Sequence, residues 1–122
     1  MDGTNKFFFD TYAIFEILKG NKNYEKYKDC EIITTIFNIA ELNYNLKKER
    51  SKDEADKITK KFLNFIVDVP YVFLIEAMDL KITEKQISIP DAVGYTTAKR
   101  NKVKFLTGDI HFKGMDNVEF VK

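Results

Sequence analysis

Four acidic residues are spaced so that alternating strands and helices can bring them together: Asp10, Glu41, Asp91 and Asp109. Asp10 and Asp109 each follow a short apolar run that is typical of a buried strand. Clustered carboxylates repel one another unless a cation neutralises them. Hard oxygen ligands without soft partners select Mg²⁺ or Mn²⁺, and such an ion activates water for attack on a phosphodiester. These residue types therefore predict metal-assisted hydrolysis of a nucleic-acid backbone.

Composition predicts one domain, residues 1–122, because a chain of 122 residues with 44% hydrophobic residues can bury a proper core. With 20 basic and 19 acidic residues the formal charge is +1, so any nucleic-acid site must be a local patch. The sequence has one cysteine, Cys30, and one histidine, His111, which excludes an internal disulfide and a Cys/His zinc site.

No stretch resembles a signal peptide or a membrane span of about 20 apolar residues. We expect a soluble, cytoplasmic protein that does not associate with membranes.

The hydrophobic pattern alternates between strands and helices along the whole chain. We expect strands at 6–10, 31–35, 103–106 and 117–121. We expect helices at 11–20, within 21–28, at 36–49, from 52 to about 66, from 75 to about 84, and after Pro90, with 72–74 as a short strand or an extended entry. Such alternation predicts an α/β fold with a mainly parallel sheet and helices on both faces.

Open parallel sheets bind ligands outside the carboxyl ends of their strands, near the point where strand order reverses. Asp10 and Asp109 face each other there if their two strands are neighbours. Asp91 opens a helix and Glu41 lies about one turn into another, so both can reach the same edge. Taken singly, Asp10 is also explained as a helix N-cap, Asp91 by the helix dipole and Glu41 as a solvated helix residue. A shared acidic site explains all four at once.

Basic residues near the last acid are candidates for contacts with the flanking phosphates of a nucleic acid, although each is also an ordinary surface charge. They are Lys99, Arg100, Lys102, Lys104 and Lys113.

Four phrases of the sequence, FFFDTYAIFEIL, IFNIAELNY, SIPDAVGYTTAKRNKVKFLTGD and FKGMDNVEF, resemble the PIN domain family, and in particular the VapC-like toxins of prokaryotic toxin–antitoxin pairs. The resemblance implies a three-layer α/β/α sandwich around a parallel sheet, and a Mg²⁺- or Mn²⁺-dependent endoribonuclease. By position, the metal-binding acids would be Asp10, Glu41, Asp91 and Asp109. Asn38 and Thr107 would orient a carboxylate or a phosphate.

The resemblance also implies partners, namely an RNA substrate, an antitoxin protein and a second copy of the chain. Helix faces around Phe15 or Phe62 are candidate dimer surfaces, although both residues are equally expected in the core. Some relatives carry a further acid at the position of Asp116, which stays a lesser candidate because a loop acid is usually a solvated turn residue. His111 lies two residues beyond Asp109, and whether it belongs to the site stays open on the sequence alone.

Other functions stay open on the sequence alone. The same fold also serves RNA-processing nucleases, and it can act as a binding module that holds RNA or a protein without catalysis. A different acid-pocket enzyme is a third possibility. An aspartyl phosphatase needs a second Asp two residues after the first, where this chain has Tyr12. A receiver domain needs paired acids near the end of its first strand, and the sequence lacks them.

Overall fold

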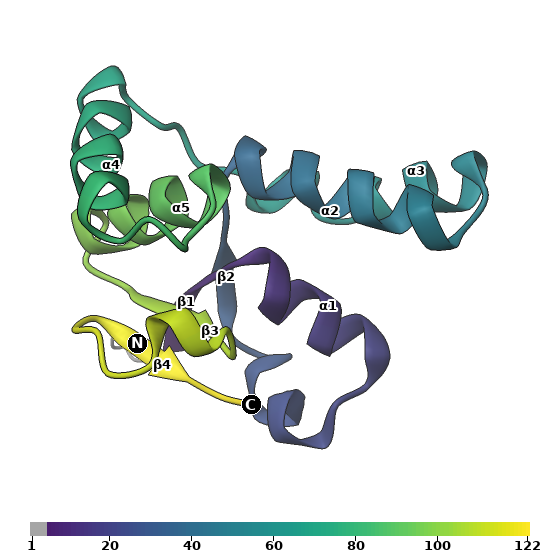
Figure 1. The fold of residues 1–122 in the computed structure, drawn as a ribbon. Coiled ribbons are helices and arrows are strands. Elements are labelled where there is room, and N and C mark those ends of the chain that lie inside the picture. Colours follow the sequence, from purple (N-terminus) through teal and green to yellow (C-terminus); the bar gives the residue numbers. More distant parts are fainter. Residues whose placement is uncertain (1–4) are drawn as a thin grey trace.

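A computed structural model describes residues 5–122 and has a four-stranded sheet at its centre (Figure 1). The strand order is β2-β1-β3-β4, with β1 at Lys6–Phe9, β2 at Glu31–Ile33, β3 at Lys104–Thr107 and β4 at Val118–Phe120. All three pairings are parallel, which confirms the predicted sheet. Because β1 pairs with β2 on one side and β3 on the other, strand order reverses between β1 and β3.

Helices fill the connections between the strands. They are α1 Thr11–Lys19, α2 Ile36–Glu49, α3 Lys52–Lys60, α4 Tyr71–Thr83 and α5 Ile89–Arg100, with short 3₁₀ helices η2 Lys22–Tyr27, η3 Leu63–Phe65 and η4 Ile110–Phe112. Four of them begin at a side chain that accepts a hydrogen bond from the backbone N–H three residues later, which satisfies an otherwise unpaired donor: Asp10, Thr35, Ser51 and Ser88. None of the described helices has the length and apolar character needed to cross a membrane.

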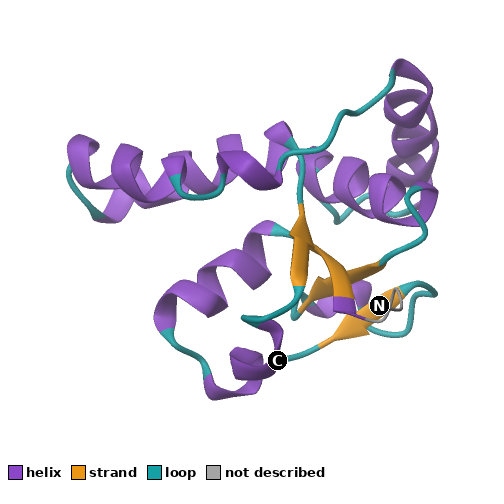
Figure 2. Ribbon diagram, turned by 180° about the vertical axis from the view of Figure 1, so that it is seen from behind, coloured by secondary structure: helices purple, strands orange, loops and turns teal. Residues whose placement is uncertain are grey.

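Each face of the sheet has its own buried core, because successive strand side chains point to opposite faces. Phe8 and Phe105 lie in the core that α4 and α5 cover, and their rings stack with centroids 5.5 Å apart. Phe9 and Leu106 lie in the other core, with α1, η2, α2 and α3. Figure 2 shows the strands between these helices. The predicted three-layer α/β/α arrangement is therefore confirmed.

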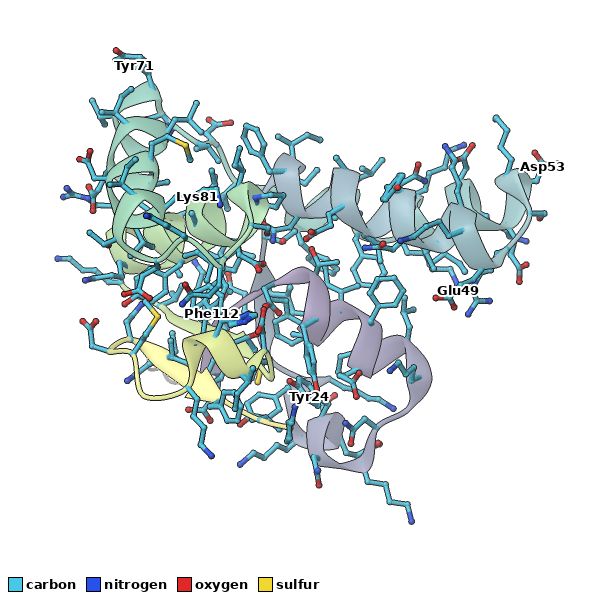
Figure 3. All side chains as sticks on the ribbon, in the orientation of Figure 1. Tyr24, Glu49, Asp53, Tyr71, Lys81 and Phe112 are labelled. Carbon is cyan, nitrogen blue, oxygen red and sulfur yellow. The ribbon has the colours of Figure 1, made fainter. Side chains whose placement is uncertain are left out.

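Helices α2 and α3 form a hairpin that extends beyond the edge of the sheet (Figure 1), and we call residues 36–60 the α2–α3 arm. Figure 3 shows Glu49 and Asp53 near the far end of this arm. Asn43 joins the two helices, since its Nδ2 donates to Asp56 and Thr59, each at 3.0 Å. The arm thus places the C-terminal half of α2 away from the sheet.

Two predicted elements differ from the structure. The helix expected from 52 to about 66 ends at Lys60, because the chain turns through η3 so that Ile66 forms a parallel bridge with Thr34 beside β2. The segment 72–74, expected as a strand or an extended entry, is the first turn of α4. Its β-branched and aromatic residues resemble a strand, but Leu74 and the following residues pack as a helix on the α4–α5 core.

Candidate active site

All four predicted acids line one open pocket of about 220 Å³ at the carboxyl ends of β1 and β3. The other residues that line it are Thr11, Tyr12, Phe15 and Asn45. Two acids come from the ends of neighbouring strands and two from helices, so the contributing segments are far apart in the sequence. The structure therefore brings the predicted residues together at the point where strand order reverses, as expected for an open parallel sheet.

Asp10 lies at the bottom of this arrangement, with 1% of its surface exposed. Its Oδ1 accepts a hydrogen bond from the Ala13 backbone N–H at 2.8 Å, so the same residue caps α1 and lines the pocket. Burial raises the pKa of Asp10 well above its ordinary value, and the nearby charges of Asp91 and Asp109 add to this, while a hydrogen bond with Thr107 opposes it. A buried carboxylate with two acidic neighbours is a position where a cation would be strongly favoured.

Asp91 enters the pocket from the first turn of α5. Ser88 caps the helix by accepting the Asp91 backbone N–H at 3.1 Å, which fixes this turn beside the sheet. Burial, together with the charges of Glu41 and Asp109, raises the pKa of Asp91 to about 7. The neighbouring acids therefore interact electrostatically although they come from different elements.

Thr107, the last residue of β3, connects the two strand-end acids. Its hydroxyl hydrogen-bonds with Asp10 and also accepts the Asp109 backbone N–H at 3.0 Å. Asp109 in turn caps η4, because its Oδ1 accepts the His111 backbone N–H at 3.0 Å. The imidazole Nδ1 of His111 lies 3.0 Å from the same oxygen. Thr107 is thus placed to orient both carboxylates, and His111 is beside the acid at the rim.

Asn38 does not line the pocket, although it lies one turn before Glu41 on α2. Its side chain is fully buried, with Oδ1 accepting from the Thr35 hydroxyl at 2.6 Å, while Nδ2 has no hydrogen-bond partner among residues 5–122. Its backbone carbonyl accepts from the Thr11 hydroxyl at 3.3 Å, which ties α2 to α1. Asn38 therefore supports the helix that carries Glu41.

Tyr12, Phe15 and Asn45 line the pocket, and the sequence did not single them out for this role. Asn45 follows Glu41 by four residues, which puts both on one helix face. This spacing was the feature of the sequence that could have identified Asn45 as a pocket residue. Tyr12 lies against Gly108, where an added Cβ would be 2.4 Å from the Tyr12 ring and 2.4 Å from the Val121 carbonyl oxygen. Only glycine allows this close approach, which holds Tyr12 next to the loop that carries Asp109.

Three of the five basic candidates for phosphate contacts lie away from the acid pocket. Lys102 and Lys104 line a separate hollow with Lys6, at the amino ends of β1 and β3. Arg100 pairs with Glu76 on α4. The structure thus places these residues at the opposite edge of the sheet from the acids.

The remaining two candidates lie close to the last strand and loop. Lys99 lies 3.4 Å from Asp116, whose other oxygen accepts from the Tyr95 hydroxyl at 2.8 Å, so Asp116 is not a pocket residue. Lys113 lies over the ring of Phe120, with its Nζ 5.7 Å from the ring centroid. Since Phe120 pairs with Thr107, Lys113 is the basic candidate on the acidic side of the sheet.

The side chains of the pocket fit a hard divalent cation by their chemistry. They offer carboxylate and amide oxygens. The raised pKa values of Asp10 and Asp91 show that their ionised forms are disfavoured, and a bound cation would reduce this penalty. Within residues 5–122, no three acidic, His or Cys side chains are arranged as a group that could hold a metal ion. Mg²⁺ is commonly held by one or two carboxylates, with water and substrate phosphate completing its octahedron, and this donor set suits that mode.

The protein is thus an α/β protein of the class in which a parallel sheet lies between helices and an acidic pocket lies where the strand order reverses. The sequence matches the PIN domain over residues 7–118, and the chain belongs to this family. A search of curated protein sequences found no match.

Several solved structures share the fold. A toxin–antitoxin complex from Klebsiella pneumoniae contains a chain that is 18% identical, with a TM-score of 0.72 and coverage of 93% of this chain and 95% of that one. VapBC2 from Rickettsia felis, bound to a promoter DNA fragment, is 20% identical with a TM-score of 0.71, covering 96% and 99%. VapBC-1 from nontypeable Haemophilus influenzae is 12% identical with a TM-score of 0.69, covering 94% and 96%. At these identities the likeness concerns the fold.

Proposed function

We propose that this protein is a metal-dependent endoribonuclease that hydrolyses RNA phosphodiester bonds in the cytoplasm, as the toxin of a VapBC-type pair. The observation that carries the proposal is the gathering of Asp10, Glu41, Asp91 and Asp109 in one pocket. Membership of the PIN family, whose members are generally nucleases, supports it. Carboxylates alone repel a phosphodiester, so this pocket suits RNA only when a cation is held in it.

The four acids have distinct places in the proposed site. Asp10 and Asp109 would face Mg²⁺ or Mn²⁺ from the sheet side, and Asp91 and Glu41 would face it from α5 and α2, one or two of them binding it directly and the others through its water ligands. When bound, the ion lowers the pKa of water and stabilises negative charge on the phosphorus and the leaving oxygen. Thr107 keeps the two strand-end carboxylates in place through the hydrogen bonds described above.

Cleavage of RNA by the purified protein tests this function directly. With Mg²⁺ or Mn²⁺ we expect cuts within a mixture of single-stranded and structured RNA, and with chelator we expect none. The same samples are melted in a Mn²⁺ titration, where binding to the folded state should raise the melting temperature. A protein that neither cuts RNA nor gains stability from Mn²⁺ would contradict the proposal and favour a binding module.

An antitoxin is the protein partner that this proposal implies, and several structural neighbours are toxin–antitoxin complexes. A neighbouring reading frame for a small protein with a DNA-binding N-terminal region would identify the candidate. Its purified product should suppress the cleavage described above, whereas unchanged cleavage in its presence would argue for an RNA-processing role.

We also propose a homodimer, formed through α4. The earlier candidates do not suit this role, because Phe62 is buried and Phe15, which is partly buried, lines the acid pocket. Instead α4 exposes large apolar side chains, with Tyr71 73%, Val72 63% and Ile82 72% exposed. Tyr71 marks the outer end of this helix in Figure 3. Burial of such side chains against a second copy is favourable at roughly 25 cal/mol per Å².

Light scattering measures the expected dimer. Wild type should have the mass of two chains, and Ile82→Glu should shift the equilibrium to one chain by placing a charge in the apolar surface. Because Ile82 is largely exposed in the single chain, the variant should still fold, with a melting temperature lowered only by the loss of dimerisation. A monomeric wild type, or an Ile82→Glu protein that remains dimeric, would contradict this interface.

A further inference from the structure

A second hollow adjoins the acid pocket and continues it along the space between α1 and α2. Its volume is about 290 Å³, and it shares three lining residues with the acid pocket: Tyr12, Phe15 and Asn45. Its other lining residues are Glu16, Lys19, Lys48 and Glu49. We call this hollow, with its shared wall, the α1–α2 groove. Glu49, labelled in Figure 3, marks its far end, where the α2–α3 arm turns.

The side chains along the groove change in character from one end to the other. On α2, Glu41, Asn45 and Lys48 are spaced four and three residues apart, so they follow one helix face. On α1, Tyr12, Phe15 and Lys19 are spaced three and four residues apart, so they also follow one helix face. The acid pocket therefore lies at one end, an amide and aromatic rings in the middle, and two ammonium groups, together with the carboxylates of Glu16 and Glu49, at the other end.

The basic end is both exposed and close to further positive charge. The Lys48 Nζ lies 4.9 Å from the centroid of the Tyr44 ring, and the Lys19 Nζ lies 3.0 Å from Glu16. The segment 47–61, which includes Lys48 and Glu49, contains seven basic and four acidic residues. Two lysines and two glutamates line this end of the groove, so it lacks the excess of carboxylates found in the acid pocket.

A nucleic-acid strand that reaches the acid pocket needs affinity from outside it, because the pocket itself repels phosphates. Aromatic rings stack on bases of any sequence, and lysines neutralise phosphates, which is the usual combination in sites for single strands. The α1–α2 groove offers both, directly continuous with the acids. The basic residues Lys102 and Lys104 lie instead beyond a strand that is roughly 13 Å long.

We propose that the α1–α2 groove binds the single-stranded RNA that flanks the cleaved bond, with bases against Tyr12 and Phe15 and phosphates at Lys19 and Lys48. This assignment rests on the function proposed for the acid pocket, and it specifies the path of the substrate strand next to that pocket.

Binding of a short fluorescein-labelled single-stranded RNA, measured by anisotropy in chelator so that nothing is cut, tests the groove separately from catalysis. The variant is Lys19→Gln/Lys48→Gln. Its matched control is Lys26→Gln/Lys28→Gln, since Lys26 lies 5.3 Å over the Tyr27 ring and Lys28 lies 3.3 Å from Glu25. The control pair thus loses the same charges and the same kinds of local contact on η2 and the residue after it.

We expect the groove variant to bind about tenfold more weakly than wild type at about 100 mM salt. Each lost phosphate contact removes about 0.7 from the slope of log K against log salt for a single strand, so the slope should become shallower by about 1.4. The control should match wild type in both measurements. Melting temperatures should be the same for all three proteins, because these lysines are exposed.

Three outcomes would overturn the groove assignment. They are a groove variant that binds like wild type, a control that loses as much affinity, and a wild type that does not bind the RNA. In the first case the groove accepts something other than RNA, such as a polypeptide. Failure of the proposed function is a different observation, namely RNA binding that depends on Lys19 and Lys48 without any metal-dependent cleavage.

Discussion

Replacing Asp10 by Asn is expected to reduce metal-dependent RNA cleavage by at least about 1,000-fold, which corresponds to roughly 4 kcal/mol in the activation free energy. The substitution removes a carboxylate from the floor of the acid pocket but keeps the residue's shape. Asn also accepts the Ala13 N–H that Asp10 accepts at 2.8 Å, and it is an equally good helix N-cap. The loss should therefore concern cation binding rather than folding.

The control for this experiment is Asp53→Asn, which removes one negative charge from the exposed first turn of α3. It should cleave like wild type. Melting curves in chelator should show Asp10→Asn at least as stable as wild type, because the buried charge is gone. Cleavage near the wild-type rate by folded Asp10→Asn would remove Asp10 from the site, and an unfolded variant would move the test to Asp109→Asn.

Replacing Asp91 by Asn is expected to stabilise the metal-free protein above neutral pH. The pKa of Asp91 is about 7 in the folded protein against an ordinary value of 3.8, because of burial and the charges of Glu41 and Asp109. The folded state thus binds this proton more tightly than the unfolded chain. Its stabilising contribution is complete below about pH 4 and is lost as the pH rises to about 7. At about pH 8, the wild type therefore carries the full penalty of the ionised group.

The expected gain for Asp91→Asn at about pH 8 is on the order of 2–4 kcal/mol in the free energy of unfolding, from about 1.4 kcal/mol for each unit of pKa, less the attraction of the helix dipole. Below about pH 4 the two proteins should be equally stable. Urea unfolding in chelator across this range measures the difference. Asp53→Asn is the matched control, since Asp53 is also an acid in the first turn of a helix but is exposed. It should lose only a few tenths of a kcal/mol, and an Asp91→Asn effect that is equally small or independent of pH would contradict the predicted linkage.

Much of the local structure could be predicted from the sequence because local physics decides it. Gly20 ends α1 in the left-handed region, with a φ of 76°, where glycine has no steric penalty. Ser88 and Pro90 open α5 at the residues expected from capping preferences. The prediction of a strand or extended entry at 72–74 was wrong. Tertiary packing decides the structure there, because the helix that contains Leu74 packs on the core it shares with α5, and this outweighs the β propensity of the segment.

The basic residues illustrate what local patterns do not settle. In the sequence, Lys99 to Lys104 stand between Asp91 and Asp109, which suggested that they surround the acids. In space, α5 carries the chain roughly 18 Å away from the pocket, and β3 brings it back. The residues in the middle of this excursion are consequently at the far edge of the sheet, beside Lys6.

The sequence by itself determined which acids were candidates, the elements that precede or carry them, and the parallel α/β class, because caps, turn residues and hydrophobic periods act over a few neighbouring residues. Only the tertiary structure decided that β1 and β3 are neighbours, with Phe9 paired to Leu106. That pairing joins segments almost a hundred residues apart, and it places Asp10 next to Thr107 and Asp109. The α1–α2 groove is of the same kind: its two rows of side chains are helix faces in the sequence, and they become one surface only because α1 and α2 pack on the same core.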